Sequence, residues 1–261
     1  MSQVILYDIP SKDPRHCWSL NPWKSALLTL PITAFKDLDN TDQLWTARLL
    51  LNLKGIPYKT EWLEYPDIAP TFKSFGIPPN EPPATAYTSP TIRIADKYVM
   101  DSRKIADVLE QEHPFPSLHL DSPILKKVEE LASQCVAPLG PVFMPRIPRT
   151  VVNPASAEYF ERTRAARFGM PLSQLEKEKG GESAWKAVEP KWMELGNLLK
   201  AEGGPFFMGK TVSYADLIVV GALHCFTMLG DDAMFQRVKD VEPAFLTLYN
   251  ASKAWLERDD H

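Results

Sequence analysis

The residues from Gly204 to Thr211 match the G-x-x-x-x-G-K-[ST] pattern of phosphate-binding loops. In such a loop the backbone N–H groups surround the phosphates of a nucleotide, and the lysine, here Lys210, adds a positive charge. The loop must follow a β-strand and open a helix for these N–H groups to converge on the phosphates. The pattern therefore predicts nucleotide chemistry only if a strand precedes Gly204.

The residues before this pattern predict a helix instead of a strand. The stretch KWMELGNLLKAEGG has helical character and ends in Gly203 and Gly204, either of which can stop a helix. The four variable positions read PFFM, so they supply one proline without an N–H group and three bulky apolar side chains. We interpret the match as coincidental, and nucleotide hydrolysis is the least favoured function.

A capping box, Ser213-Tyr-Ala-Asp216, follows directly. The Ser213 side chain can accept a hydrogen bond from the backbone N–H three residues on, and Asp216 can reach back to Ser213. The third position carries Asp instead of the usual Glu or Gln. The next residues, LIVVGAL, are apolar enough for a central buried helix. We therefore interpret Ser213 and Asp216 as structural capping residues and not as catalytic groups.

Composition narrows the classes of function. The chain has 261 residues and a net charge of −4, which gives no electrostatic reason to expect nucleic acid or an anionic membrane as partner. No run approaches the ~18 apolar residues of a membrane span, and no secretory signal is visible, so a cytoplasmic location is expected. The three cysteines are too few for a disulfide framework or a zinc site, and the five histidines are scattered, so no metal is expected.

The chain divides into two regions with different secondary-structure patterns, and their elements must position the residues of any functional site. Residues 1–115 alternate strand-like and helix-like segments in the order β-α-β-(α)-β-β-α, which predicts a small mixed sheet with helices packed on it. Its first helix is expected to begin at Asn40, Thr41 or Asp42 and to end at Gly55. The remaining expected elements are strands within 4–7, 56–65 and 88–102 and a helix over 102–114.

Residues 122–261 show only helical periodicity and predict an all-helical domain of five or more helices. One apolar stripe runs from Ile124 to Cys135 and ends at Pro138 and Pro141. Further helices are expected near 159–168, 184–199, 214–229 and 244–256.

Several of these segments resemble the glutathione transferase family. FFMGKTVSYADLIV resembles the capping motif of the family's helical domain, and YTSPTI followed by DSRKIADVLEQEHP resembles the other half of its signature. CWSLNPW and TARLLLNLKGIPYKTEWLEYPDI resemble the fungal-specific class A, the etherase-related transferases. The resemblance implies a thioredoxin-like βαβαββα domain (1–115) that binds glutathione. It also implies an all-helical domain (122–261) that carries the hydrophobic substrate site.

The resemblance assigns glutathione-binding roles to four residues. Pro90 is expected to follow a cis peptide bond, which costs little for X-Pro, and to turn the backbone of Ser89 toward the cysteinyl part of glutathione. Asp101 and Ser102 are expected at a helix N-terminus, where free N–H groups favour the γ-glutamyl carboxylate. Capping of the helix by these two residues is compatible with this role.

Catalysis in the family depends on the thiolate of glutathione, which a hydroxyl at a helix N-terminus stabilises. In the fungal class the donor region resembles SPNTWKTR. Here SLNPW (19–23) matches its first half and WTAR (45–48) its second half, with an extra segment at 24–44 between them.

This extra segment leaves two placements of the hydroxyl donor. Either Ser19 stays in the site with Asn21 as a second donor, or an ungapped register brings Thr41 to that position. We favour Ser19 and Asn21, because their neighbours match as well. Displacement of both would leave a protein that binds glutathione without catalysis. Cys17 is an alternative nucleophile, since some members of the family use a cysteine here to form mixed disulfides with glutathione.

The activity that the resemblance implies is conjugation of glutathione to hydrophobic aromatic electrophiles, or glutathione-dependent cleavage of their ethers, in detoxification. Trp18, Trp23, Phe143 and Met144 are the expected walls of the hydrophobic site. The alternative is a ligandin, which binds glutathione and aromatic compounds with little turnover. Glutathione is the expected co-substrate, and the resemblance also implies a homodimer.

Overall fold

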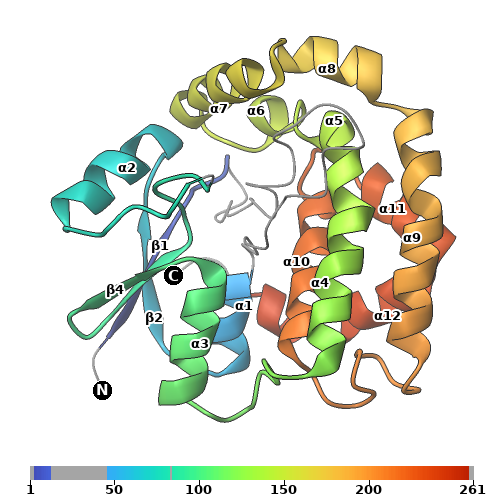
Figure 1. Ribbon diagram of the computed structural model, residues 1–261, viewed down its shortest axis with the longest axis horizontal. Helices are drawn as coiled ribbons and strands as arrows, with labels where there is room; N and C mark the ends of the chain where they lie inside the picture. Colours follow the sequence, from blue (N-terminus) through green and yellow to red (C-terminus); the bar gives the residue numbers. More distant parts are fainter. Residues whose placement is uncertain (1–2, 13–45, 83, 259–261) are drawn as a thin grey trace.

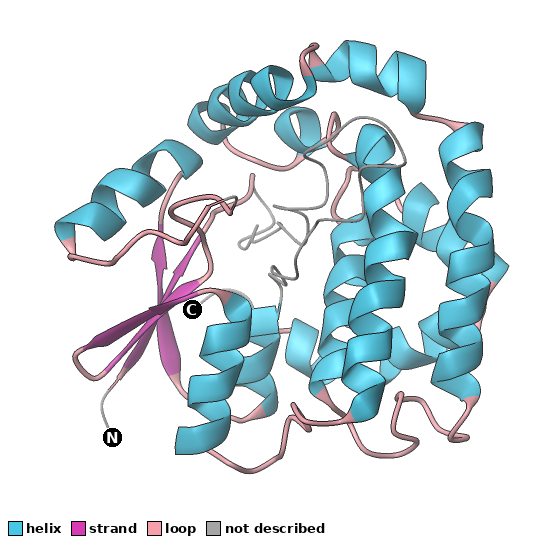
Figure 2. Cartoon of the chain, in the orientation of Figure 1, coloured by secondary structure: helices cyan, strands magenta, loops and turns pink. Residues whose placement is uncertain are grey.

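The computed structural model describes residues 3–12, 46–82 and 84–258, and Figure 1 shows their arrangement. The strands are gathered in one sheet at one end of the molecule, and helices make up the other end (Figure 2). The strands are β1 (Val4–Asp8), β2 (Tyr58–Trp62), β3 (Thr91–Ile94) and β4 (Lys97–Met100). The helices that alternate with them are α1 (Thr46–Leu53), α2 (Tyr65–Ser74) and α3 (Ser102–Glu112). This is the βαβαββα order expected for the first part of the chain.

The four-stranded sheet has the order β2-β1-β3-β4. β1 runs parallel to β2 and antiparallel to β3, and β3 forms an antiparallel hairpin with β4. The apolar run of β1 lies in the middle of the sheet, where a strand is covered on both faces. Because Tyr7 lies opposite Thr91, the end of β1 and the start of β3 meet at the same edge of the sheet. That edge receives the loop before β3.

Helix α1 ends where the sequence predicts. Gly55 has a φ of 64°, which a glycine adopts readily, and its N–H donates to the carbonyl of Asn52. The N–H of Ile56 donates to the carbonyl of Leu51, which completes the hydrogen-bond pattern of a glycine-terminated helix. The expected caps at its start, within residues 40–42, lie outside the described residues.

The second part of the chain contains only helices within its described residues. The longer ones are α4 (Pro123–Val136), α7 (Pro154–Phe168), α8 (Leu172–Lys179), α9 (Glu182–Lys200), α10 (Tyr214–Thr227), α11 (Ala233–Val241) and α12 (Ala244–Ala251). Short turns complete it: η2 (Ala137–Leu139), α5 (Gly140–Phe143), α6 (Ile147–Thr150) and α13 (Lys253–Leu256). Helix α10 contacts α1, α4, α11 and α12, so its apolar sequence is buried on several sides. None of the described helices is long and apolar enough to cross a membrane.

Two groups of hydrogen bonds hold the end of α1 in place. The buried Lys54 Nζ donates to the Glu110 carboxylate at 2.8 Å and to the carbonyls of His113 and Pro116 at 2.5 and 2.9 Å. The Asn52 amide donates to the carbonyl of Trp255 at 2.6 Å and to that of residue 258 at 3.0 Å. The C-terminal end of the chain therefore lies against the sheet domain, as Figure 1 shows.

Candidate functional site

The loop before β3 lies at the edge of the sheet where β1 ends. The Ser89–Pro90 peptide bond is cis, which confirms the expectation for this position. The Ser89 hydroxyl is buried and donates to the carbonyl of Tyr7 at 3.2 Å, which fixes the loop to the end of β1. The carbonyl of Pro90 accepts the N–H of Asp101 at 3.4 Å. The loop and the start of α3 are thus joined directly.

Asp101 caps helix α3. One of its carboxylate oxygens, Oδ1, accepts the N–H groups of Arg103 at 2.8 Å and Lys104 at 3.2 Å. Asp101 has a φ of 90° and a ψ of 126°, and a positive φ is uncommon for a residue other than glycine. Ser102 follows as the first residue of the helix and is buried beside it. The N-terminus of α3, which is the positive end of its helix dipole, therefore faces the cis-proline loop.

Helix α10 of the helical domain reaches this helix start. The Tyr214 hydroxyl lies beside the Ser102 hydroxyl. Burial raises the pKa of Tyr214 far above its ordinary value, whereas the contact with Ser102 lowers it. The Arg103 guanidinium lies 6.0 Å from the centre of the Tyr214 ring and 3.6 Å from the Glu129 carboxylate. Residues of both domains therefore hold the start of α3.

A tyrosine near the loop, Tyr7, was not predicted as a site residue. Its ring packs against Phe72, Phe75 and Tyr98, with ring centres 5.5 to 6.1 Å apart. Burial, together with the neighbouring Tyr98, raises the pKa of Tyr7 to about 12. A hydroxyl that stabilises a thiolate needs an environment that favours negative charge, and this one disfavours it. Tyr7 contributes its backbone carbonyl, which accepts the Ser89 hydroxyl.

A buried ion pair organises the ends of β1 and β2. The Arg48 guanidinium, in the first turn of α1, lies 3.0 Å from the Asp8 carboxylate, and both side chains are at most 2% exposed. Arg48 also donates to Tyr58 at 3.2 Å and Thr60 at 3.1 Å and lies over the ring of Trp62. The sequence had identified Arg48 only as the end of a family motif. The structure gives it the role of fixing α1 over the sheet.

The expected catalytic residues and part of the expected hydrophobic site cannot be placed. They lie outside the described residues, and their roles remain predictions: Cys17, Trp18, Ser19, Asn21, Trp23 and Thr41.

The other expected walls of the hydrophobic site lie in the core of the helical domain. Phe143 and Met144 are both buried, and the Phe143 ring packs 6.2 Å from that of Phe226. Phe143 belongs to α5 and packs against α10 through this contact, and contact of Phe143 and Met144 with a ligand remains a prediction.

The phosphate-loop pattern forms a closed turn. The N–H and carbonyl of Phe206 pair with the carbonyl and N–H of Gly209, and the N–H of Thr211 donates to Met208. A Cβ on Gly204 would lie 2.1 Å from the Gly209 oxygen, so this glycine allows two backbone segments to touch. These N–H groups are therefore paired within the turn and do not form a phosphate site.

The capping box after this turn is present as expected. One oxygen of the buried Asp216 accepts the Phe207 N–H at 2.8 Å, and the other accepts the N–H and the hydroxyl of Ser213 at 2.7 and 2.8 Å. Burial raises the pKa of Asp216 to about 6, although these hydrogen bonds lower it. Asp216 joins the closed turn to the start of α10.

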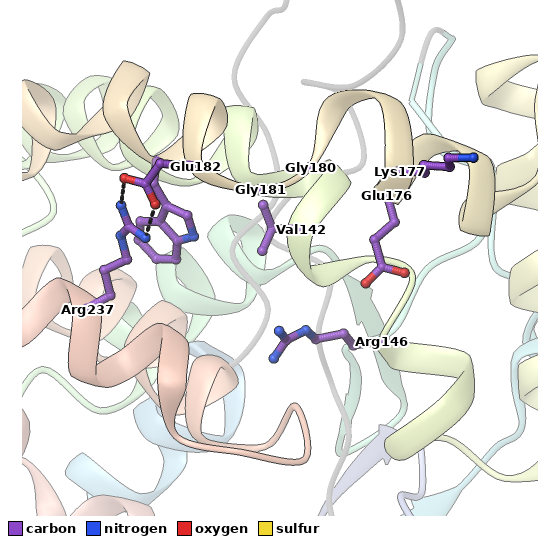
Figure 3. A pocket seen from close by; sticks show the side chains of 9 residues that line it. Val142, Arg146, Glu176, Lys177, Gly180, Gly181, Glu182 and Arg237 are labelled. Atoms are coloured by element: carbon purple, nitrogen blue, oxygen red, sulfur yellow. Dashed lines mark hydrogen bonds and ion pairs between the residues drawn. The ribbon is translucent and has the colours of Figure 1, made fainter.

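A separate pocket of about 450 Å³ lies among α5, α8, α9 and α11 (Figure 3). The Arg237 guanidinium forms two hydrogen bonds with the Glu182 carboxylate, at 2.5 and 2.7 Å, and lies 4.8 Å from the Trp185 ring. Arg146 pairs with Asp231 at 3.0 Å. The pocket is therefore lined more by charged side chains in arginine–carboxylate pairs than by apolar side chains, and we do not assign the hydrophobic substrate site to it. Throughout the described residues, no three histidine, cysteine, aspartate or glutamate side chains gather as metal ligands.

Comparisons with known proteins give the same picture for both parts of the chain. The family model of the glutathione S-transferase N-terminal domain matches residues 44–112, and that of the C-terminal domain matches residues 128–246. The glutathione S-transferase-like protein ustS of Aspergillus flavus is 30% identical over 250 residues, which cover 85% of this chain and 89% of ustS.

Similar solved structures extend over nearly the whole chain. Glutathione transferase GSTFuA3 from Phanerochaete chrysosporium has a TM-score of 0.79 and 27% identity, with 98% of each chain covered. The glutathione S-transferase CsGST63524 of Ceriporiopsis subvermispora, solved in complex with glutathione, has a TM-score of 0.76 and 26% identity. Its alignment covers 97% of this chain and 98% of that one. With a thioredoxin-like sheet domain, a helical domain and a match to both family models, the protein belongs to the glutathione S-transferase family.

Proposed function

We propose that this transferase binds glutathione at the edge of the sheet where β1 ends, and transfers it to hydrophobic aromatic electrophiles. One observation carries the proposal. The cis Ser89–Pro90 loop and the N-terminus of α3 are joined by the hydrogen bond from the Asp101 N–H to the Pro90 carbonyl. This joint brings a turned loop backbone and the positive end of a helix dipole to one place. The glutathione bound in CsGST63524 supports this ligand.

Each end of glutathione has a counterpart in this arrangement. The backbone of Ser89 pairs with the cysteinyl part, and Ser102, through its hydroxyl and its N–H at the start of α3, receives the γ-glutamyl carboxylate. Asp101 uses one carboxylate oxygen for the cap. The other oxygen forms no hydrogen bond with the residues described, and we assign it to the ammonium group of glutathione.

In the proposed reaction the thiol of glutathione loses its proton to solvent, and a hydroxyl donor stabilises the thiolate. The sulfur forms a bond to an electrophilic carbon, and the bond to a halide or aryloxide breaks as that group leaves with the electron pair. Ser19, assisted by Asn21, is the proposed donor, with Thr41 and Cys17 as the alternatives. Release of an aryloxide would make the enzyme an etherase.

We further propose that residues 1–115 hold glutathione, that residues 122–261 carry the hydrophobic site, and that the enzyme works as a homodimer in the cytoplasm. A ligandin with little turnover is the second candidate. It is favoured by the extra residues 24–44, which interrupt the donor motif.

Calorimetric titration of the purified protein with glutathione tests the common part of both candidates. Saturable one-to-one binding is expected, and absence of binding would refute both. Conjugation of glutathione to an aryl halide then separates transferase from ligandin, because only a transferase gives a rate that depends on enzyme concentration.

The variants Ser19→Ala and Thr41→Val identify the hydroxyl donor. Ser19→Ala is expected to lower kcat/KM by 10² or more with the Kd of glutathione unchanged, because removal of a single stabilising donor costs about that factor. Ser74→Ala, which removes an exposed hydroxyl of α2, is the matched control and is expected to keep the wild-type rate. Full activity of Ser19→Ala, together with loss of activity in Thr41→Val, would transfer the role to Thr41.

A further inference from the structure

A small pocket of about 150 Å³ lies between α2 of the sheet domain and α7 of the helical domain. Its walls include three tyrosines, Tyr65, Tyr87 and Tyr159, and two arginines of α7, Arg164 and Arg167. A cavity of this size holds one benzene ring. The pocket thus combines space for a single ring with aromatic walls and two positive charges.

The walls are held in position by hydrogen bonds between the starts of the two helices. The N–H of Tyr65 donates to the Ser156 hydroxyl at 2.9 Å, and that hydroxyl in turn donates to the Glu64 carboxylate. The Asn153 amide donates to the same carboxylate at 2.8 Å. The rings of Tyr65 and Tyr159 are almost parallel, 7° apart in orientation, with their centres 6.2 Å from each other. The pocket is therefore preformed.

The two arginines have no carboxylate partner among the described residues. The Arg164 guanidinium lies 4.2 Å from the centre of the Phe160 ring and donates one hydrogen bond, to Thr163 at 2.9 Å. In the part of the chain that the structure describes, no carboxylate forms an ion pair with Arg164 or Arg167. Burial lowers the pKa of both guanidinium groups, and the charge of Arg164 lowers that of Arg167 further.

Arg164 and Arg167 are both partly buried, and two like charges partly removed from water, with no carboxylate partner among the described residues, disfavour the folded state. A bound anion would relieve this cost. A guanidinium group has five N–H donors arranged to match a carboxylate. Arg162 on the same helix is different, because it is exposed and pairs with Glu158 at 3.4 Å. The pocket therefore selects an anion, and its tyrosines select a flat ring next to the charge.

We propose that this pocket binds a single-ring aromatic carboxylate, with the carboxylate on Arg164 and Arg167 and the ring among the tyrosines. The site goes beyond glutathione transfer and does not depend on it. Tyr87 lies two residues before Ser89, so the pocket adjoins the proposed glutathione site without including the residues assigned to it.

Calorimetry with benzoate, benzamide and cyclohexanecarboxylate tests this proposal. Benzoate is expected to bind one-to-one, and its affinity is expected to exceed that of neutral benzamide and of non-aromatic cyclohexanecarboxylate by about tenfold or more. Arg164→Gln and Arg167→Gln are each expected to weaken benzoate binding by about tenfold or more. The matched control Arg162→Gln, which removes the same charge from the same helix, is expected to change it less than twofold.

Circular dichroism shows whether each variant folds. If Arg164→Gln does not fold, Arg167→Gln tests the same charge requirement. Benzoate is expected to bind equally well in saturating glutathione. Absence of saturable benzoate binding, equal affinity for benzamide, or equal weakening by Arg162→Gln would overturn the proposal. Displacement of benzoate by glutathione would overturn it as a separate site, whereas failure of glutathione itself to bind would affect only the proposed transferase site.

Discussion

Asp101 allows the capping role and the ligand role of one carboxylate to be separated. Its Oδ1 caps α3 through the N–H groups of Arg103 and Lys104, and the other oxygen is assigned to the ammonium of glutathione. Asp101→Asn keeps one oxygen for the cap, and its side chain has the same shape, so the backbone conformation at this position is not made less favourable. It removes the negative charge and replaces the other oxygen by an amide nitrogen, which cannot accept a hydrogen bond from an ammonium group.

The two effects have different expected magnitudes. The free energy of unfolding is expected to fall by no more than about 1 kcal/mol, the value of a negative charge at a helix N-terminus. A hydrogen bond between charged groups contributes about 1.5–3 kcal/mol, so the Kd of glutathione is expected to rise by about 10- to 150-fold. Urea unfolding gives the first quantity and calorimetric titration gives the second.

A second cap supplies the control for this experiment. Ser122 caps α4 by accepting the N–H of Ile124 at 3.4 Å, and it is not among the residues assigned to the glutathione site. Ser122→Ala is expected to lower the unfolding free energy by about 1 kcal/mol and to leave the Kd of glutathione unchanged. If Asp101→Asn binds glutathione within twofold of the wild type, the carboxylate is only a cap and the assignment to the ammonium is refuted.

Three further predictions concern buried groups. The pKa of Asp216 is raised to about 6, so between about pH 4 and 6 the folded state keeps a proton that the unfolded state releases. The free energy of unfolding therefore falls by roughly 3 kcal/mol as the pH rises through this range. The stability advantage of the wild type over Asp216→Asn is therefore expected to shrink in urea unfolding from pH 4 to 7, and a widening difference would contradict the raised pKa. Asp8→Asn leaves a buried arginine without its counter-ion and is expected to lower the free energy of unfolding by about 3–5 kcal/mol. Asp96→Asn, which removes one partner of an exposed ion pair, is expected to lower it by less than about 1 kcal/mol in the same assay. Burial raises the pKa of the Cys135 and Cys225 thiols, so little of the reactive thiolate is present and iodoacetamide is expected to leave both unmodified in the native protein. Peptide mass mapping measures the labelling, and labelling as fast as in urea would show that the two thiols are accessible.

The sequence predicted those features that depend on neighbouring residues. Gly55 stops α1, Ser213 and Asp216 form the capping box, and the peptide bond before Pro90 is cis. The first two follow from short patterns with a direct steric or hydrogen-bonding cause, whereas the cis bond was expected from the resemblance to the glutathione transferase family. The strand and helix order of the first domain followed in the same way, from apolar runs and the turns between them.

Features that depend on contacts between distant segments could not be predicted in this way. Apolar side chains at Phe143 and Met144 indicate burial, and both are buried in the structure, but the sequence does not show which segments pack against them. Arg164 and Arg167 have the appearance of ordinary helix-surface charges. Only the packing of α2 against α7 shows that they are partly buried beside a shared pocket.

Two helices of the second domain were also missed, for a different reason. Helices α8 and α11 have only eight and nine residues, LSQLEKEK and AMFQRVKDV, and little more than two turns is too short for an apolar period to be recognised. Such short helices depend on tertiary packing more than on their own propensity.

The hydrogen bonds of Asn52 to the last described residues have a consequence for synthesis of the protein. Asn52 and Trp255 are separated by 203 positions, and ribosomes add about 5–20 residues per second, so roughly 10 to 40 seconds pass between the emergence of the two partners. During this interval α1 and β2 have been translated, but the partner carbonyls for the Asn52 amide do not yet exist. Tyr58, whose hydroxyl lies 3.3 Å from the carbonyl of residue 258, is in the same position. The sheet domain, although it precedes the helical domain in the chain, therefore reaches its final set of hydrogen bonds only after residues 255 to 258 have been translated.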